Sequence, residues 1–565
     1  MSTPGRPAAD TVLVEGAVYT VDAARSWAAA IAIRDGRIIA VGRDDEVRTL
    51  VGRHTRVLAL AGRMVVPGFQ DSHVHALSGG LSRLRCDLAQ EHTVTGYLDR
   101  LEGYATAHPT LSWIVGEGWS MDVFPGGTPG KELLDRIIPD RPVFLGNRDN
   151  HGAWVNSRAL ALAGVDRDTP DPQEGRIERR EDGEPQGTLQ EGAMGLVSQH
   201  LPPISSAELR NGLLEGQRYL HSLGITGWQD AIVGRYATMP DNFDTYRELA
   251  ASGELTGRVV GALWWERGAG LDQLDGLIGR RAAVGAGRFQ ATSVKLMIDG
   301  ICETFTAAVS EPYLDGAGRP TANLGLTFFD PDSLLEEAAA IDAAGFQLHF
   351  HAIGDRAVRL ALDAVAQARL RNGARDHRHH IAHLQLVRPQ DRPRFRELGV
   401  AANTQPFWSM LDRQMEELTL PFLGSERAAW QYPWASLRRH GAMLTVGSDW
   451  PVSSPDPLWL LHVMVNRQAP SAFAAAVGLP MRGPPFLPDE RVELATALAA
   501  ATIGSAYVNH LEDQTGSIEV GKLADLTVLD RNLFAAPPSS IGEARTVLTM
   551  VEGDPVYADP QLVSW

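Results

Sequence analysis

The chain has 565 residues, of which 44% are hydrophobic and 21% charged, an ordinary composition for a globular protein. Its 52 Lys and Arg against 69 Asp and Glu give a formal net charge of −17, which disfavours binding to nucleic acid or to an anionic membrane surface. Two cysteines, Cys86 and Cys302, exclude a disulfide-built secreted scaffold. Because the N-terminus lacks a signal-peptide pattern and no apolar run is long enough to span a membrane, we expect a cytoplasmic enzyme.

Strand-like segments lie at both ends of the chain. Residues 11–22, 29–42 and 56–68 alternate apolar residues with turn signals, and residues 516–530 and 547–557 have the same texture. We expect the two ends (1–66 and 512–565) to pair into one small β-sandwich. Two separate terminal subdomains are the alternative.

The long middle of the chain alternates short apolar runs with Ala-, Leu- and Arg-rich stretches of helical period. Eight such units in order predict an α/β fold with a (β/α)8 TIM barrel over residues 67–511. About 150 residues separate the first two runs, so we expect a large insertion after strand 1, at about 100–215. The eight runs are 68–76, 224–233, 256–266, 292–300, 346–355, 379–387, 399–408 and 442–452.

His-x-His pairs are the first candidates for chemistry. On a strand, residues i and i+2 point to the same face, so His73 and His75, which end the first run, can grip a divalent metal together. Further candidates follow later strands: Lys295 on the fourth, His351 on the fifth, His383 on the sixth and Asp449 on the eighth. A barrel gathers such positions at its C-terminal face, where barrel active sites lie.

Another pair, His377 and His379, stands in the polar segment HRHH. Those surroundings favour a solvated strand entry over a metal site.

Several segments taken together resemble the metal-dependent amidohydrolase superfamily. They are SHVHA, SVKLMIDG, HFHAIGD, AHLQLV and GSDWPV, in that order. The nearest likeness is to the YtcJ-like branch, which includes N-substituted formamide deformylases. Residues 116–160 resemble a segment particular to that branch, and residues 516–530 resemble its closing sandwich strands. The resemblance covers nearly the whole chain.

The resemblance implies a role for each candidate ligand. His73, His75 and Asp449 would bind the more buried metal, and His351 and His383 the second. The metal would be one or two divalent ions, with Zn²⁺ expected, although such sites also accept Mn²⁺, Fe²⁺ or Co²⁺.

Lys295 matches a position where many relatives carry a lysine carboxylated by CO2 that bridges two metals. The alternative is a plain lysine paired with a carboxylate such as Asp299. His349, by the same alignment, would be a core or supporting residue.

Five residues are candidate substrate contacts. Within the inserted segment these are His151, Trp119 and Trp154, for which packing of the insertion is the alternative. Trp408 and Trp450, just past the seventh and eighth strands, would form an apolar wall. They favour a small-molecule substrate with an apolar or aromatic substituent.

The function that the resemblance implies is a metal-dependent hydrolase acting on a non-peptide amide-type C–N bond. The bond would be of N-substituted formamide, N-acyl, carbamate or urea type, cleaved by attack of metal-bound hydroxide with Asp449 as the catalytic proton carrier. The alternatives are hydrolytic deamination of a ring and a non-catalytic regulatory protein on the same scaffold. Ring deaminases place a glutamate shortly after the fifth-strand histidine, where this chain has Asp355. Family habit suggests a homodimer.

Overall fold

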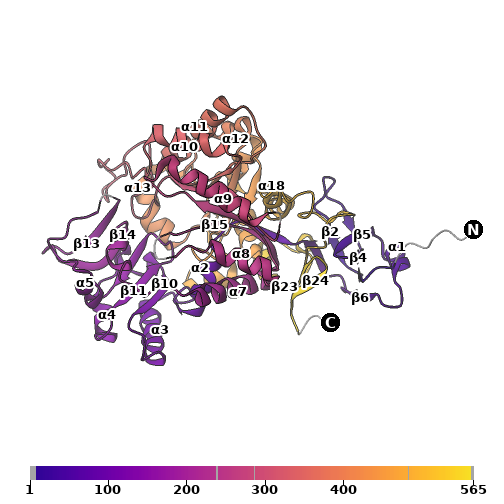
Figure 1. Ribbon diagram of the computed structural model, residues 1–565, viewed down its shortest axis with the longest axis horizontal. Coiled ribbons are helices and arrows are strands. Elements are labelled where there is room, and N and C mark those ends of the chain that lie inside the picture. Colours follow the sequence, from indigo (N-terminus) through magenta and orange to yellow (C-terminus); the bar gives the residue numbers. More distant parts are fainter. Residues whose placement is uncertain (1–7, 173, 237–238, 286, 481–482, 561–565) are drawn as a thin grey trace, which may run out of the picture.

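The computed structural model describes residues 8–560 apart from 173, 237–238, 286 and 481–482. Figure 1 shows a central body of strands and helices with an inserted unit at one end and the terminal strands at the other. Both chain ends lie on the side of the terminal strands.

The central body is a barrel of eight parallel strands in the order β21-β20-β19-β18-β17-β16-β15-β8. Its first and last strands meet where the hydroxyls of Ser72 and Thr445 lie 2.8 Å apart. Seven of the eight strands fall within the predicted runs, and β17 begins three residues before its run, so the TIM barrel is confirmed. The strands are β8 (Phe69–Val74), β15 (Ile225–Val233), β16 (Arg258–Trp264), β17 (Phe289–Met297), β18 (Gln347–Ala352), β19 (His380–His383), β20 (Ala401–Thr404) and β21 (Leu444–Val446).

Helices surround the barrel, and several begin at well-formed caps. The Ser205 hydroxyl and the Glu208 carboxylate form a capping box at the start of α7, and Asp330 caps α10 ahead of Pro331. Such caps satisfy backbone N–H groups that a helix start leaves free. The main helices are α2 (Ala76–Leu84), α7 (Ser206–Ser222), α8 (Phe243–Ser252), α9 (Leu274–Val284), α10 (Pro331–Ala343), α11 (Asp355–Asn372), α12 (Arg392–Leu398), α13 (Leu420–Ala428), α14 (Trp434–Arg439), α15 (Pro457–Asn466) and α17 (Leu494–Ala499).

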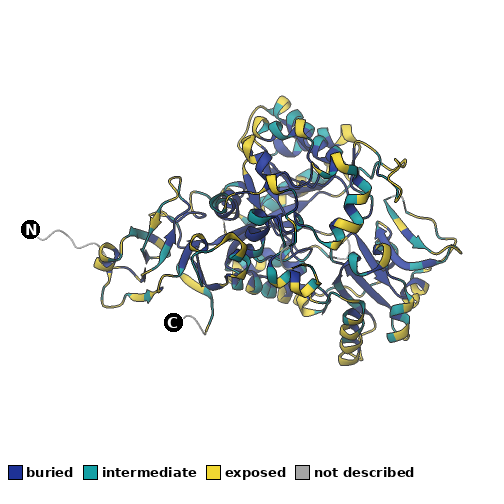
Figure 2. Ribbon diagram, turned by 180° about the vertical axis from the view of Figure 1, so that it is seen from behind, coloured by how far each residue is buried: buried dark blue, intermediate teal, exposed yellow. Residues whose placement is uncertain are grey.

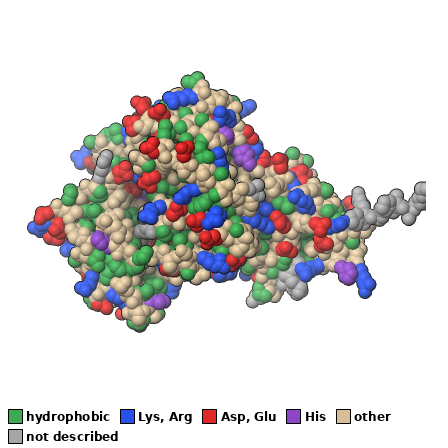
Figure 3. Space-filling model, in the orientation of Figure 1, with side chains coloured by type: hydrophobic (Ala, Val, Ile, Leu, Met, Phe, Trp, Pro, Cys, Tyr) green, Lys and Arg blue, Asp and Glu red, His purple; other side chains and the backbone are tan. Residues whose placement is uncertain are grey.

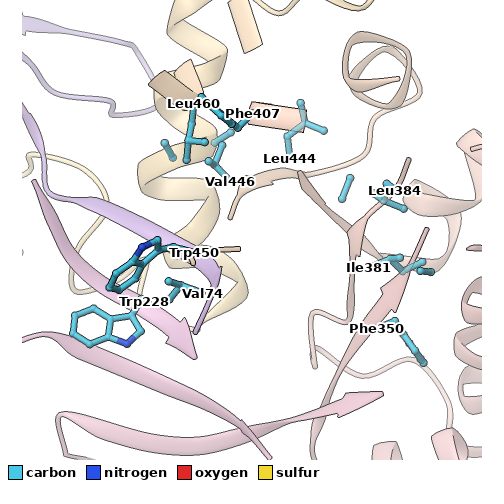
Figure 4. Packing of buried hydrophobic residues seen from close by; sticks show 14 of the residues in the cluster. Val74, Trp228, Phe350, Ile381, Leu384, Phe407, Leu444, Val446, Trp450 and Leu460 are labelled. Atoms are coloured by element: carbon cyan, nitrogen blue, oxygen red, sulfur yellow. The ribbon is translucent and has the colours of Figure 1, made fainter. Parts of the chain in front are cut away.

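Side chains of the barrel strands fill its interior and the layer beneath the helices. Figure 4 shows part of this cluster, including Phe350 of β18, Ile381 of β19 and Leu444 of β21. Figure 2 shows the buried residues concentrated in the strands and the exposed ones on the outer faces of the helices. A close-packed interior of this kind holds the strand ends, and the side chains they carry, in fixed positions.

Helices α2 and α7 cross at very short range. A Cβ on Gly80 would lie 1.8 Å from the carbonyl oxygen of Gly212, and one on Gly216 would lie 2.1 Å from that of Ala76. Only glycine permits this approach of two backbones. The crossing fixes α2, which begins immediately after the metal-site candidate His75.

The insertion between β8 and β15 forms its own six-stranded sheet in the order β13-β14-β12-β11-β10-β9. Helices α3 (Val94–Ala107), α4 (Glu132–Ile137), α5 (Ser157–Ala163) and α6 (Met194–Ser198) accompany it. Hydrophobic clusters lie against this sheet, so it has a core of its own. Its strands are β9 (Cys86–Asp87), β10 (Ile114–Trp119), β11 (Val143–Asn147), β12 (Gly152–Val155), β13 (Gly175–Arg179) and β14 (Pro185–Glu191).

Strands from both ends of the chain share one sheet, with the order β24-β23-β22-β7-β2-β3. A second sheet, β5-β4-β1-β6, packs with it through residues such as Leu13, Ile31 and Val528. The β-sandwich built from both termini is therefore confirmed. The strands are β1 (Thr11–Val14), β2 (Ala17–Tyr19), β3 (Trp27–Ala28), β4 (Ala30–Arg34), β5 (Arg37–Gly42), β6 (Arg56–Ala59), β7 (Met64–Pro67), β22 (Leu526–Leu529), β23 (Thr546–Val551) and β24 (Asp554–Ala558).

Among the residues described, no helix combines the length and apolar character needed to cross a lipid bilayer.

Candidate metal centre

Three predicted ligands meet where β8 and β21 end. His73 lies on β8, His75 directly follows that strand, and Asp449 follows β21. The Nε2 atoms of His73 and His75 lie 3.1 and 3.0 Å from Asp449 Oδ1. Potential ligand atoms of the three side chains all lie within 4.8 Å of one another. Two imidazoles and a carboxylate at this spacing can share one divalent cation.

The other three predicted ligands border this group. His383 Nδ1 lies 3.9 Å from Asp449 Oδ2, and the rings of His383 and His351 are centred 4.3 Å apart. Lys295 Nζ lies 3.5 Å from His73 Nε2. The barrel thus brings all six residues together at the C-terminal ends of its strands.

Burial controls the charge state of these groups. It lowers the pKa of His73 to about 3 and that of Lys295 to about 7, and it holds the pKa values of His351 and His383 well below the ordinary value. For Asp449, burial alone would raise the pKa, but the adjacent His73, His75 and His383 keep it well below its usual range. The chain therefore presents neutral imidazoles beside a carboxylate, the protonation state that metal ligands need.

Two buried atoms of the site, Asp449 Oδ1 and His383 Nδ1, have no well-directed hydrogen bond among the described residues, although two imidazole nitrogens lie within 3.1 Å of Asp449 Oδ1. Buried acceptors without donors are costly, at about 1–3 kcal/mol each. A divalent cation would satisfy them, so the residues present fit a metal.

Further residues hold the ligands in place. His349 Nε2 lies 2.7 Å from His73 Nδ1, which leaves His73 Nε2 directed to the site. Asp71 Oδ1 accepts the backbone N–H groups of His73 and Ser448, each at 3.0 Å. Hydrogen bonds of this kind around a metal ligand fix its tautomer and orientation. His349 is thus a supporting residue, as predicted.

The ligands line a cavity of about 720 Å³. Its wall includes three of the predicted substrate contacts, His151, Trp408 and Trp450. The Trp408 ring stacks on His383 with centroids 5.1 Å apart, and His151 faces His351 at 5.9 Å. The cavity therefore has the apolar wall expected beside the ligands.

Trp119 and Trp154 are not in the cavity wall, and their assignment as substrate contacts is corrected. Both are fully buried in the core of the insertion. Their indole N–H groups donate to the carbonyl oxygens of Leu145 and Gly130. The packing alternative holds for these two residues.

Among the carboxylates that the sequence did not indicate, two have partners in or beside the cavity. Asp230, near the end of β15, lines the cavity and accepts a hydrogen bond from Tyr246. Glu191, at the end of β14, accepts from His151 Nδ1 at 2.9 Å. The position of Asp230 on a barrel strand, like that of Asp449 after one, was a usable signal. Glu191 had none, because nothing in the sequence places β14 beside the barrel.

Of the pair His377 and His379 in HRHH, His379 has both ring nitrogens in hydrogen bonds to the protein. His379 is buried, with Nε2 at 3.1 Å from Asp342 Oδ1 and Nδ1 accepting the backbone N–H of Leu348. It lies at the start of the strand, away from the metal-site candidates. The expected solvated entry is wrong for His379, although the rejection of a metal role at this pair fits its contacts.

Comparison with known proteins shows which family this chain resembles. The Amidohydrolase family model matches residues 56–557. Protein LONG AFTER FAR-RED 3 of Arabidopsis thaliana is 33% identical over 99% of this chain and 93% of its own length. The putative amidohydrolase YtcJ of Bacillus subtilis is 29% identical over 96% and 98% of the two chains, and the N-substituted formamide deformylase of Arthrobacter pascens is 27% identical over 96% and 97%.

A crystal structure of an uncharacterized metal-dependent hydrolase from Pyrococcus furiosus superposes with a TM-score of 0.67. It is 27% identical and covers 92% of this chain and 99% of its own. The family match, the relatives and the shared architecture agree over nearly the full length. The chain belongs to the amidohydrolase family, in the YtcJ-like branch, and its fold is that of a metal-dependent hydrolase.

Proposed function

We propose that this protein hydrolyses a non-peptide amide-type C–N bond, of N-substituted formamide, N-acyl, carbamate or urea type, in a small molecule. The observation that supports this most is the convergence of His73, His75 and Asp449 at the carboxyl end of the barrel. An N-substituted formamide deformylase is among the relatives that match along the whole chain.

The proposed chemistry divides between a metal and the chain. A bound divalent cation lowers the pKa of a coordinated water toward about 7 and polarises a carbonyl. His73, His75 and Asp449 would hold one cation. Asp449 also accepts the proton of the attacking water and passes it to the leaving nitrogen as the C–N bond breaks. Its low pKa keeps the carboxylate ionised before the reaction.

A second cation would be held by His351 and His383, with Lys295 carboxylated by CO2 between the two. Lys295 is buried, and burial lowers its pKa to about 7, so a large share of the amine is neutral near physiological pH. The neutral amine is the form that adds to CO2. We expect Zn²⁺, because neutral imidazoles and carboxylates at these distances suit it.

The substrate would carry an apolar or aromatic substituent against Trp408 and Trp450. Both indoles line the cavity close to the ligands. Burying apolar surface against an aromatic wall is favourable in free energy, so substituents of this kind should bind best.

Deamination of a ring has less support. Asp355, the residue nearest to the expected glutamate, begins α11, and its carboxylate accepts hydrogen bonds from the backbone and hydroxyl of Ser310. Asp355 is absent from the described lining of the cavity. A proton donor for a ring would have to come from elsewhere.

The test is a screen of the zinc-loaded protein against N-benzyl and N-aryl formamides, acetamides, carbamates and ureas, scored by amine release. We expect turnover of at least one class that a chelator abolishes and added metal restores. Metal-bound protein that turns over nothing in the screen would instead favour a non-catalytic role.

A cytoplasmic location and a homodimer remain predictions. Both cysteines, Cys86 and Cys302, are buried and unpaired, which suits a reducing compartment. Light scattering of the purified protein will determine the oligomeric state.

A further inference from the structure

The cavity at the metal centre continues away from it along α2. One face of this helix lines the cavity from end to end, through Leu77, Ser78, Leu81, Ser82 and Leu84. These positions follow the three- and four-residue spacing of a single helix face. His75 precedes the first residue of α2, so the near end of the helix lies at the metal centre and its far end at Leu84.

The opposite wall of this extension comes from the insertion. Trp113, Val115 of β10 and Phe144 of β11 line the cavity, and so does Leu111, which precedes them in the chain. Leu84 and Leu111 are 51% and 38% exposed, large hydrophobic side chains left open to water. Figure 3 shows hydrophobic side chains gathered at the lower left, where Figure 1 places the insertion beside α2. Two exposed leucines at one cavity mouth indicate an apolar binding surface.

The polar groups of this extension have partners inside the protein. Arg85 pairs with Glu208 at 3.0 Å at the outer end, and the Ser82 side chain hydrogen-bonds Glu117 midway. Burial raises the pKa of Glu117, which disfavours its charged form. Leu77, Leu81, Leu84, Trp113 and Phe144 supply apolar surface beside these pairs.

From these observations we propose that the substrate carries an extended, uncharged apolar arm that lies between α2 and the inserted sheet, with its amide at the metal centre. This inference rests on the proposed function and names its substrate class: N-alkyl or N-acyl amides with a long chain rather than a compact ring alone. We expect an arm of the substrate to occupy this surface, because one cavity is lined both by the candidate metal ligands and by the two exposed leucines. The nine residues of α2 set the reach at about 13 Å.

The close crossing of α2 and α7 supports this assignment. Gly80, Gly212 and Gly216 hold the helix at fixed depth, so the wall exists before the substrate arrives. Because the groove is preformed, binding a flexible chain does not require free energy to order the groove wall.

The experiment compares N-butylformamide with N-octylformamide in two readouts. Calorimetry on the metal-loaded Asp449→Asn variant, in which turnover is suppressed, gives Kd, and amine release by the wild type gives kcat/KM. We expect the octyl compound to bind about tenfold or more tightly than the butyl compound, since each fully buried methylene is worth up to about fourfold. The gain should stop when the chain outgrows α2, so N-dodecylformamide should add little.

The double variant Leu84→Gln with Leu111→Gln should bring the octyl-to-butyl ratio of Kd and of kcat/KM close to one. Both leucines are exposed, so the fold tolerates the change. Leu162→Gln is the matched control, because Leu162 is 49% exposed on the same insertion and is not among the residues that line the cavity.

Equal affinity for the two chain lengths, a ratio that survives the double variant, or no measurable binding of either compound overturns the proposal. Preferred octyl binding without amine release from these formamides, or from the other classes of the screen, would support the groove and refute the hydrolase. Equal amine release from the butyl and octyl compounds would support the hydrolase and refute the groove.

Discussion

Two groups of buried histidines in this protein differ in their surroundings and in the roles we assign to them. At the carboxyl ends of the strands, His73, His75 and His383 face one carboxylate, and Asp449 Oδ1 and His383 Nδ1 have no well-directed hydrogen bond in the described chain. Elsewhere, His379 and His221 have both ring nitrogens in hydrogen bonds to the protein. The first group converges on a shared carboxylate, whereas His379 and His221 each bond separate protein partners, and the predictions below test this distinction.

The largest effect should come from Asp449→Asn. Loss of the proton carrier should lower kcat by about 10²–10⁴-fold, because positioned general acid–base catalysis contributes that much. Amine release is the measurement, with metal content determined in parallel. Near-wild-type kcat with metal still bound would remove Asp449 from the proposed role.

Removing the metal should destabilise the protein, and only the histidines at the carboxyl ends of the barrel strands should be involved. At a free metal concentration of 100 times Kd, binding stabilises the folded state by about 2.7 kcal/mol, and a chelator should remove this. Denaturant unfolding with and without chelator measures the difference. The difference should shrink in His75→Ala, and an unchanged value there would place the metal elsewhere.

In the second group, His379→Ala should cost stability without affecting metal. It leaves the Asp342 carboxylate and the Leu348 N–H without their partner, for about 1–3 kcal/mol. Unfolding free energy and metal content are the paired measurements. Loss of metal in this variant, comparable to that in His75→Ala, would erase the distinction between the groups.

The smallest effect is a pH dependence carried by His221. Burial lowers its pKa from 6.5 to about 4. As pH falls, the unfolded chain therefore takes up a proton before the folded chain does, and stability is lost between pH 6.5 and 4. Between pH 7 and 5.5 the loss attributable to His221 is about 1 kcal/mol.

This contribution is measured as the difference in unfolding free energy between wild type and His221→Asn at the two pH values. The destabilising effect of the substitution should be smaller at pH 5.5. An equal effect at both values would show that His221 does not titrate differently in the two states.

The sequence predicted the barrel and the clustering of the candidate ligands because both depend on order and spacing. Strands that alternate with helices specify a parallel barrel, and residues at strand ends such as His383 and Asp449 then share one rim whatever their separation in the chain. Those positions do not depend on the details of the insertion.

The residues that line the cavity walls were harder to predict from the sequence. Trp119 and Trp154 lie in the same inserted segment as His151, yet only His151 faces the cavity, because the sheet turns the tryptophans into the core of the insertion. The partnership of His151 with Glu191 depends on how β14 folds back 40 residues later. Long-range packing of this kind leaves no periodic signal in a single sequence.

The central claim is that the histidines of the rim, and not those packed elsewhere, hold a divalent metal. Elemental analysis of purified wild type, His75→Asn and His379→Asn tests it most directly. We expect one or two zinc ions per chain in wild type and His379→Asn, and a marked loss in His75→Asn. A wild-type chain that is stable and binds no divalent metal, or equal metal content in all three proteins, would contradict it.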